Sequence, residues 1–501
     1  MLHLSSSSSS SSFPTKPTMR SNIFHKAQRV MTLFKQCTTM KEVKQLHAHI
    51  THTGLDQTLC VLGKVISFCA VSDLGDMDYA VSVFSSIESP DGFLWNTMIR
   101  GFGKTDKPER AFEFCKRMQE KGNVADNFTL SFLLKVSGQL GSDILGKQIH
   151  CTTVKNGFDS NVFVRNTLIH MYGMFGDAKT ALHLFDEMPS PDLVAWNTII
   201  DSHVNCGKCN EALDLFLRMM DRGVDTDEAT VVVTLSACST LGALDFGRWV
   251  HCLVDHTDLG NVVTVSNSLI DMYAKCGAVE EAYDAFNKMK GKKNIVSWNT
   301  MILGLATHGH ADKSLDLFLK MLEEKLERPD GVTFLGVLCA CSYGGMVDEG
   351  RRYFEIMSKD YQIQPTVKHY GCMVDMLGRA GFVEEAYRLI RSMPVKCNAI
   401  VWRTLLSACQ VHGEVELGEK VRSHLLELAS DHSSDYVLLA NMYASLGQWN
   451  EAMRVRRSMQ YRGVEKPEPG NSLVGADLHM KLKMDSTEAY SEDINAAVTS
   501  S

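Results

Sequence analysis

Two short patterns contain the residue types that hold a catalytic zinc ion. His412 and Glu414 form an H-x-E triplet, and Cys206 and Cys209 form a C-x-x-C pair. In zinc deaminases such residues bind the metal, while the Glu moves protons to and from the activated water. No cysteine follows the triplet, and no H-x-E triplet precedes the Cys pair at a suitable spacing. No Gly-rich phosphate loop or Ser/His/Asp signature stands out either. We therefore expect no active site, no cofactor and no metal.

Other polar residues recur in a fixed context. Asn96, Asn197 and Asn299 each follow a tryptophan, and these Trp-Asn dipeptides are about 101 residues apart. Trp402 comes 104 residues after the third of these tryptophans and is followed by Arg403. An Asn side chain both donates and accepts hydrogen bonds, so it can pair with the short edge of a pyrimidine. The tryptophans are expected in the core, on the helix face opposite the variable position.

A shorter repeat indicates the elements that position these residues. Glycines recur every 31 to 36 residues, and a small residue follows each by five positions. The glycines are Gly141, Gly176, Gly207, Gly242, Gly277, Gly309, Gly345, Gly381, Gly413 and Gly447, and the small residues are Gly146, Ala181, Ala212, Gly247, Ala282, Ser314, Gly350, Ala386, Gly418 and Ala452. Apolar residues of helical period flank each glycine. The pattern predicts helical hairpins in which the glycine ends the first helix and the small residue lets the second helix cross the first closely. Such pairs must stack to bury their apolar faces, which predicts an α-solenoid.

Composition limits the remaining classes of protein. The chain has 501 residues, 45% of them hydrophobic and 22% charged, which is typical of folded proteins. No run of eighteen apolar residues occurs, so no membrane partner is expected. Fifteen cysteines, an odd number, are typical of buried reduced thiols. The net charge of −8 argues against indiscriminate binding to nucleic acids, so any such role needs selectivity or a locally basic groove.

The N-terminal segment has the composition of an organelle transit peptide. The first 41 residues contain no Asp or Glu, and Ser5 to Ser12 are eight consecutive serines. Because Ser and Pro outnumber Arg before residue 24, a plastid is favoured over a mitochondrion. A solvated Ser-rich tail is the alternative. We place this leader at residues 1–23.

The repeats resemble those of plant pentatricopeptide repeat (PPR) proteins, in the subclass where P, L and S motifs alternate. The matching strings are LVAWNTII (193–200), GKQIHCTTVKNGF (146–158) and VFVRNTLIHMY (162–172). The resemblance implies an all-α fold, a right-handed superhelix of helix-turn-helix repeats. It divides residues 24–398 into eleven motifs, which are L 24–58, S 59–91, P 92–126, L 127–161, S 162–192, P 193–227, L 228–262, S 263–294, P 295–330, L 331–366 and S 367–398. Residues 399–432 and 433–466 resemble the family's two E motifs, and a divergent polar tail, 467–501, follows.

The resemblance also implies where RNA would bind. In this family each repeat faces one nucleotide of single-stranded RNA. The fifth and last residues of a motif read the base, and the second residue forms a sandwich around it. The implied base-reading pairs are Asn96 with Asp126, Asn166 with Asp192, Asn197 with Asp227, Asn267 with Asn294, and Asn299 with Asp330. The implied sandwiching residues are Phe93, Phe163, Val194, Thr264 and Val296.

The family's code assigns U to Asn with Asp, and C or U to Asn with Asn. From the motif at 92 to the motif at 295 the implied sequence, 5′ to 3′, is U, unassigned, U, U, unassigned, C or U, U. The unassigned places belong to L motifs, whose fifth residues include Ser131 and Val232. The Asp is expected to accept from the Asn amide and so to fix which end of the amide faces the base. The alternative interpretation of these asparagines is helix N-terminal capping.

The motif order and the two E motifs together predict a factor that selects sites for C-to-U editing of organelle transcripts. The repeats would choose the RNA, and the E motifs would recruit a deaminase in trans, so the chain itself is not expected to be an enzyme. A factor for RNA stability, splicing or translation is one alternative. A protein-binding scaffold of the tetratricopeptide type is the other, because its helix-pair repeat is similar.

Overall fold

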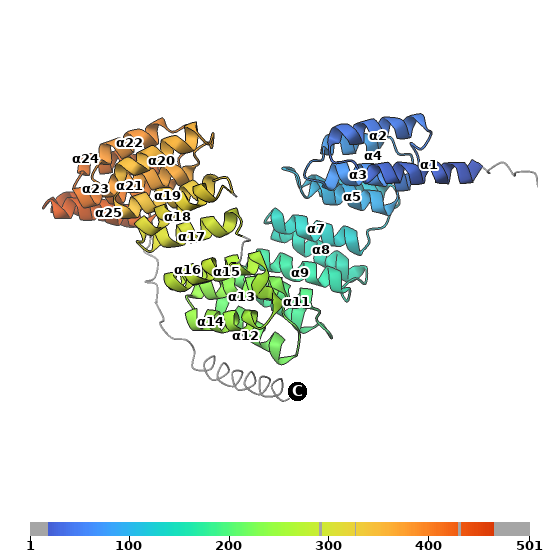
Figure 1. Ribbon diagram of the computed structural model, residues 1–501, viewed down its shortest axis with the longest axis horizontal. Coiled ribbons are helices and arrows are strands. Elements are labelled where there is room, and N and C mark those ends of the chain that lie inside the picture. Colours follow the sequence, from blue (N-terminus) through green and yellow to red (C-terminus); the bar gives the residue numbers. More distant parts are fainter. Residues whose placement is uncertain (1–18, 290–292, 326, 429–431, 465–501) are drawn as a thin grey trace, which may run out of the picture. The chain divides into compact units, whose positions relative to one another are not determined.

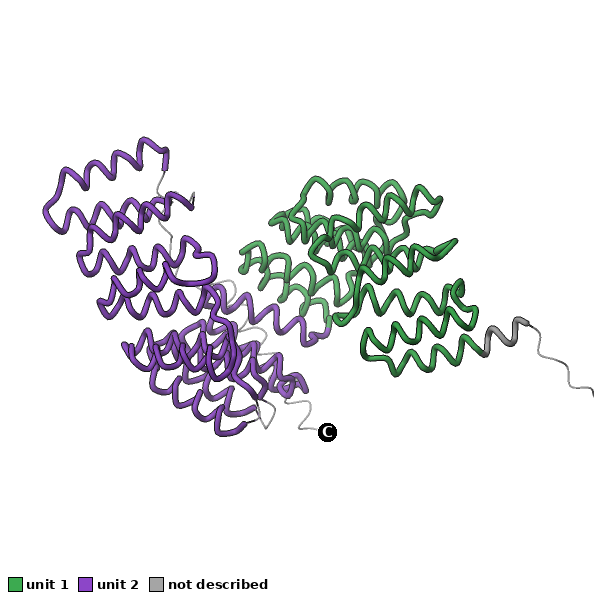
Figure 2. Tube along the Cα trace, turned by 90° about the horizontal axis from the view of Figure 1, so that it is seen from above, with its two compact units in different colours: residues 1–224 green, residues 225–501 purple. Residues whose placement is uncertain are grey.

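The chain consists of α-helices that pair along the sequence. The computed structural model describes residues 19–464 except 290–292, 326 and 429–431, and these residues form 26 α-helices, one 3-10 helix and no β-strand (Figure 1). They fall into two compact units, residues 1–224 and 225–501 (Figure 2). None of the described helices is long and apolar enough to span a membrane. The predicted all-α fold of stacked helix pairs is confirmed.

Unit 1 begins with α1 (Met19–Phe34) and α2 (Met40–His52), and five helix pairs follow. The first helices of these pairs are α3 (Leu59–Val71), α5 (Gly92–Phe102), α7 (Asn127–Gln139), α9 (Val162–Met174) and α11 (Leu193–Asn205). The second helices are α4 (Met77–Ser85), α6 (Arg110–Glu120), α8 (Asp143–Lys155), α10 (Ala178–Asp186) and α12 (Cys209–Asp221). Successive first helices pack against each other, and each second helix between α4 and α10 packs against the first helices on both sides of it. The first helices therefore form one continuous layer.

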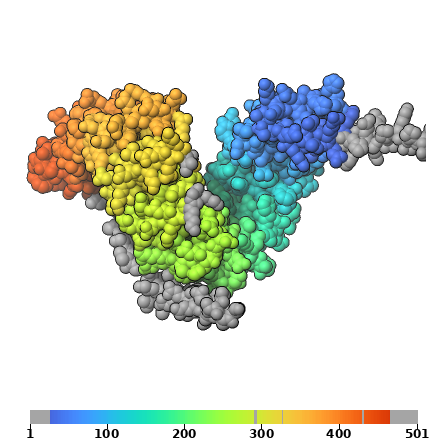
Figure 3. All heavy atoms as spheres, viewed as in Figure 1, coloured from blue at the N-terminus to red at the C-terminus, as the bar shows by residue number. Residues whose placement is uncertain are grey.

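Unit 2 repeats this arrangement with seven pairs. Its first helices are α13 (Glu228–Leu241), α15 (Val263–Lys275), α17 (Ile295–Thr307), α19 (Gly331–Gly344), α21 (Val367–Arg379), α23 (Ala399–His412) and α25 (Ser433–Ser445). Its second helices are α14 (Leu244–Asp255), α16 (Val279–Lys288), α18 (Ala311–Glu324), α20 (Val347–Lys359), α22 (Val383–Ser392), α24 (Val415–Glu427) and α26 (Trp449–Tyr461), and η1 (Asp258–Asn261) follows α14. Within each unit the repeats follow one another in chain order (Figure 3).

The ten periodic glycines end first helices, as predicted. All ten have positive φ, between 61° and 85°, a backbone conformation that favours glycine. Gly242, Gly345 and Gly413, for example, are the left-handed caps of α13, α19 and α23. The glycine period therefore marks the turn inside each helix pair.

The predicted role of the small residues is wrong at Gly146 and Gly247. An added Cβ at Gly146 would meet Met171 at 2.7 Å, and one at Gly247 would meet Met272 at 2.4 Å. Both methionines belong to the first helix of the next repeat, so these glycines make room for the neighbouring repeat. At Ser314 the prediction holds, because its Oγ donates to the carbonyl of Ile302 in its own first helix (2.8 Å). Spacing within one repeat could not indicate which neighbour lies closest.

The tryptophans of the Trp-Asn dipeptides lie in the core, as expected. Trp95, Trp196 and Trp298 are at most 2% exposed. Each ring meets a phenylalanine of the preceding second helix edge to face, at centroid distances of 4.7, 4.7 and 5.1 Å. These aromatic contacts bind successive repeats together and add about 0.5–1.5 kcal/mol each beyond burial.

The two ends of the chain lie largely outside the described residues. Residues 1–18 of the predicted leader are not described, and α1 begins at Met19, so the predicted boundary at residue 23 falls inside a helix. The predicted tail, 467–501, lies wholly outside them. All fifteen cysteines are described, and none is in a disulfide.

Candidate nucleic-acid interface

The asparagines predicted to read bases lie inside the first helices of their motifs. Asn96, Asn166, Asn267 and Asn299 are the fifth residues of α5, α9, α15 and α17, and each is 6–9% exposed. Asn197 is the fifth residue of α11 and is half-buried. The capping interpretation of these asparagines is therefore wrong, because a cap must precede the first helical residue.

The helix caps are instead the last residues of the motifs. Each one precedes the first helix of the next motif, and its side chain accepts from the backbone N–H three residues on. These caps are Asp126 on α7, Asp192 on α11, Asp227 on α13, Asn294 on α17 and Asp330 on α19. Capping places each carboxylate or amide at a defined point beside the preceding repeat.

In two P motifs the predicted pair is in contact and is joined by a threonine. Asn96 Nδ2 donates to Asp126 Oδ1 and Oδ2 at 3.0 and 3.1 Å, and Asn299 Nδ2 donates to Asp330 Oδ1 at 3.0 Å. The oxygens of the same two amides accept from Thr129 and Thr333, both at 2.6 Å. The carboxylate thus orients the amide, as expected, and a hydroxyl holds its other end.

In the S motifs the pair is in contact, but the amide is held at one end only. Asn166 Nδ2 donates to Asp192 Oδ1, and Asn267 Nδ2 donates to Asn294 Oδ1, both at 3.3 Å. The Oδ1 atoms of Asn166 and Asn267 are buried and have no hydrogen-bond partner in the protein. An unsatisfied buried oxygen costs free energy that a donor from a ligand can recover.

The fifth predicted pair is divided between the two units. Asn197 lies in unit 1, and Asp227 lies in unit 2. Asp227 caps α13 and accepts from the Thr230 backbone N–H at 2.8 Å. Its local role is thus the same as that of the other last residues.

Within each unit, the second residues of the motifs form a row of exposed side chains beside the pairs. Phe93 is 62% exposed, and Phe163, Val194 and Val296 are 47–59% exposed. Thr264 is exposed and its hydroxyl is hydrogen-bonded to the Glu228 carboxylate. Exposed apolar side chains in a regular row provide flat or apolar contacts for bases.

Two further members of this row were not predicted. Phe128 and Val332, the second residues of L motifs, are 50% and 49% exposed. The same motif register, applied to L motifs, would have found both. The rings of Phe128 and Phe163 touch, with centroids 5.7 Å apart, so a base facing Ser131 would have to separate them. Ser131 itself is buried, and its hydroxyl has no partner in the protein.

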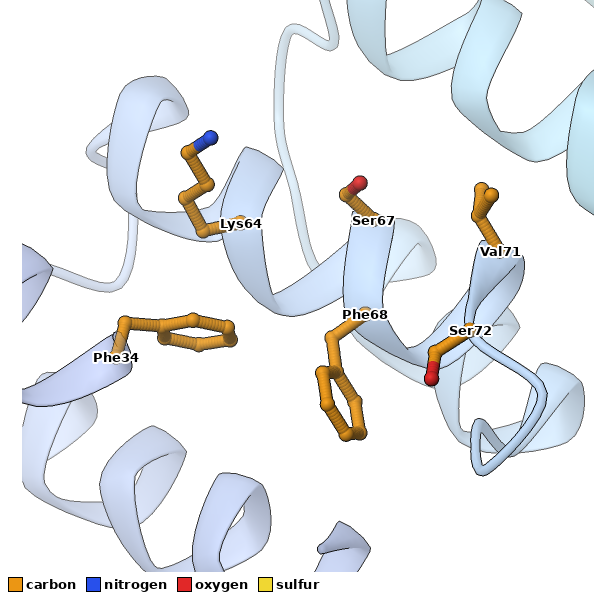
Figure 4. Close-up of a pocket in the computed structure, with 6 residues that line it drawn as sticks. All are labelled: Phe34, Lys64, Ser67, Phe68, Val71 and Ser72. Atoms are coloured by element: carbon orange, nitrogen blue, oxygen red, sulfur yellow. The ribbon is translucent and has the colours of Figure 1, made fainter. Parts of the chain in front are cut away.

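A hollow of about 410 Å³ surrounds the pair in motif 295–330. Asn299 and Asp330 line it, and the second residues Val296 and Val332 also line it. The hollow thus brings the polar pair together with the second residue of its own motif, Val296, and that of the next motif, Val332. Another hollow, of about 330 Å³, lies between α1 and α3, where Phe34 and Phe68 meet edge to face (Figure 4). It contains none of the predicted residues and is not part of the candidate interface.

The ninth residues of the motifs add charge one helical turn beyond the pairs. Arg100, Lys135 and His170 occupy this position on α5, α7 and α9, and Asp201 occupies it on α11. Burial lowers the pKa of His170 and raises the pKa of Asp201, so both are drawn toward their uncharged forms. Arg100 and Lys135 are exposed and supply the positive charge of this row.

The zinc-like patterns have structural roles. Cys206 and Cys209 lie on either side of the Gly207 turn, and Cys206 Sγ donates to the Gly173 carbonyl at 3.3 Å. His412 ends α23, and its Nε2 donates to the Gly378 carbonyl at 2.8 Å. Among the described residues no group of three His, Cys, Asp or Glu side chains is arranged to hold a metal ion.

Comparison with family models and relatives decides the identity of the repeats. Models described as "PPR repeat family" match residues 90–137 and 191–240, and models described as "PPR repeat" match 163–190, 264–294, 296–326 and 368–397. A pentatricopeptide repeat-containing protein of Arabidopsis thaliana, named chloroplastic/mitochondrial, is 41% identical over 464 residues, which cover 89% of this chain and 72% of the relative. The chain belongs to the pentatricopeptide repeat family.

Other members and one solved structure are similar as well. A second PPR protein of Arabidopsis thaliana is 38% identical over 512 residues, which cover 89% of this chain and 93% of that protein. The crystal structure of PPR10 from maize matches with a TM-score of 0.35 and 18% identity, covering 85% of this chain and 77% of the maize chain. A model described as "E motif" matches residues 412–475. The PPR repeats and the E motif together fit the E-type PLS subclass.

Proposed function

We propose that this PPR protein binds single-stranded RNA sequence-specifically and selects sites for C-to-U editing of organelle transcripts. The repeats choose the RNA, and the E motifs recruit a deaminase in trans. The observation that carries this proposal is the series of fifth-and-last pairs, four of them hydrogen-bonded at 3.0–3.3 Å beside exposed second residues. A scaffold for proteins has no need of amides oriented by carboxylates at one register position.

Two exposed cations beside fifth residues support RNA as the partner in spite of the net charge of −8. Arg100 and Lys135 stand one helical turn from fifth residues, where side chains four positions apart share a helix face. Cations there contact the phosphates of an RNA whose bases face the pairs. Affinity then comes from many modest contacts, including stacking of about 1–3 kcal/mol per base on Phe93 and Phe163.

The first test is base selectivity in vitro. The full chain should bind an RNA that carries U opposite the motifs 92–126, 162–192 and 295–330 more tightly than the same RNA with purines there. We expect each replacement to weaken binding by about tenfold or more, since one lost base contact costs about 1–3 kcal/mol. Titration of labelled oligonucleotides at fixed salt measures this. Equal, weak binding to matched and scrambled RNA would contradict the proposal and favour a protein-binding scaffold.

The E-motif region differs from the repeats in a way that suits a protein partner. In the motif 399–432 the fifth residue is Arg403, whose guanidinium is bound by the Asp435 carboxylate at 2.7 and 3.2 Å. No amide is presented there. On α26, by contrast, Trp449 and Met453 are 68% and 54% exposed, four residues apart on one face. Exposed Trp and Met side chains are typical of protein interfaces.

The editing role predicts a separation of functions. In plants lacking the protein, one or more organelle sites should lose C-to-U editing, and the wild-type chain should restore it. A chain carrying Trp449→Ala and Met453→Ala should bind the target RNA normally but restore less editing. Leu319→Ala, at an exposed apolar residue of α18 outside the E-motif region, is the matched control. Normal editing of all organelle transcripts in plants without the protein would refute the editing role, and a changed transcript abundance or splicing instead would favour the stability or splicing alternative.

The N-terminal composition and the relative named chloroplastic/mitochondrial support delivery to an organelle. We favour the plastid, with the mitochondrion as second choice, because Ser and Pro dominate residues 1–23. A fluorescent fusion to the first 41 residues tests this assignment. Fluorescence that stayed in the cytosol would contradict it.

A further inference from the structure

In two of the L motifs that follow P motifs, the third residue contacts the fifth residue of the P motif before it. The Thr129 hydroxyl lies 2.6 Å from Asn96 Oδ1 and 2.9 Å from Asp126 Oδ1, and Thr333 repeats both contacts with Asn299 and Asp330 at 2.6 and 3.0 Å. Both threonines are fully buried. The repetition in the two units shows that the contact belongs to the P-to-L junction and not to one repeat.

The S-to-P junctions lack this contact. Ala195, the third residue after motif 162–192, has no hydroxyl to offer Asn166. Ser297, the third residue after motif 263–294, bonds to Asn294 at 3.0 Å, and Asn267 Oδ1 remains without a partner. The amides of Asn96 and Asn299 are therefore hydrogen-bonded at both the nitrogen and the oxygen. The amides of Asn166 and Asn267 are hydrogen-bonded at the nitrogen only, at the longer distance of 3.3 Å.

The orientation of the Asn amide matters because U has a hydrogen-bond donor where C has an acceptor, and an acceptor where C has a donor. U offers an N–H beside its carbonyl oxygens, whereas C offers a ring nitrogen acceptor and an amino donor at the same places. An amide has two N–H donors and an oxygen with two lone pairs. After bonding to Asp and Thr, the amide of Asn299 keeps one N–H and one lone pair in a fixed orientation. A fixed amide matches one of the two bases, whereas an amide free to turn can adapt to both.

We propose that the third residue of the following motif is a positioning residue for base reading, so that Thr129 and Thr333 sharpen the choice of U over C in motifs 92–126 and 295–330. This inference rests on the proposed RNA-binding function. Two motifs with the same Asn and Asp then differ in selectivity, because 162–192 has Ala195 in place of the threonine. Thr230 is the third residue after motif 193–227, the same register position as Thr129 and Thr333.

The wild-type full chain provides the first test. Single U-to-C changes are made in a bound oligonucleotide opposite motifs 92–126, 162–192 and 295–330. The penalty should be about three- to tenfold larger at the two P motifs than at the S motif, the size of one hydrogen bond to an oriented group. Equal penalties at all three places would overturn the inference and leave the proposed function standing. No base preference at any place would instead refute the proposed function.

A variant series tests the hydroxyl directly. Thr333→Val keeps the shape of the side chain and removes the hydroxyl, so the U-to-C penalty opposite motif 295–330 should fall to the level of motif 162–192. The penalty opposite motif 92–126 should not change, which separates this effect from general unfolding. Thr333→Ser is the matched control and should retain selectivity, because it keeps the hydroxyl that donates to Asn299 Oδ1 and removes only the methyl group. Loss of selectivity in both variants would show that packing, not the hydroxyl, is responsible. Should the valine variant fail to fold, the wild-type comparison alone decides.

Discussion

Replacing Asn299 with threonine should change the base preferred opposite motif 295–330 from U toward G. The amide of Asn299 is bound to Asp330 at 3.0 Å and to Thr333 at 2.6 Å, and it lies in a hollow between Val296 and Val332. Threonine is shorter, so it makes room for a purine, and it substitutes one hydroxyl for a paired donor and acceptor. We expect a change in relative affinity of about 1–3 kcal/mol, about tenfold to a hundredfold.

The control for this switch is Asn299→Ala, which removes the amide and supplies no new polar group. It should weaken binding to every base opposite this motif without creating a preference for G. Measurement requires four oligonucleotides that differ at one nucleotide, titrated against each variant. An unchanged order of bases in the threonine variant would mean that Asn299 does not contact the base, and the hydrogen bonds around it would then have a structural role only.

Much of the fold could be predicted because its signals are local. A glycine with positive φ must end a helix wherever it occurs, and the ten periodic glycines do so. The tryptophans could be placed in the core because helical period separates them from the variable face. The leading error concerned Gly146 and Gly247, whose close neighbours Met171 and Met272 come from the next repeat. The distance between repeats depends on how they stack, and spacing within one repeat carries no information about that.

In the candidate site, too, the local features could be predicted from the sequence and the contacts between repeats could not. The pairs of fifth and last residues follow from motif register, and the structure brings four of the five predicted pairs into contact within a unit. Thr129 and Thr333 were not predicted, because a threonine at the third helical position after Asp matches a capping signature and is fully explained by it. Only the position of the preceding repeat shows that the hydroxyl also reaches Asn96 or Asn299. Contacts between repeats are thus the part that required the structure.

The contact that joins Asn to Thr after motifs 92–126 and 295–330 is replaced by an ion pair between residues 399–432 and 433–466. Arg403 is the fifth residue of 399–432, and Asp435 is the third residue of 433–466, the same two register positions. The guanidinium donates to both carboxylate oxygens, and the Asp435 side chain is 4% exposed. This bidentate ion pair thus occupies the two register positions that Asn and Thr hold at the junctions after motifs 92–126 and 295–330.

Replacing Arg403 with alanine should loosen the last helix pair, α25 and α26. The change leaves the carboxylate of Asp435 buried without its partner, which costs about 3–5 kcal/mol, and the lower end applies because Arg403 is 25% exposed. In a repeat array each repeat depends on its neighbours, so the loss should be local to the end of the array. Hydrogen exchange should therefore quicken in α25 and α26 and stay unchanged in α15 and α17.

The double variant Arg403→Ala with Asp435→Ala, which leaves no buried charge, should be less destabilised than Arg403→Ala alone. If the double variant were the less stable of the two, the pair would not act through the buried carboxylate, and packing of the arginine stem would explain the effect instead.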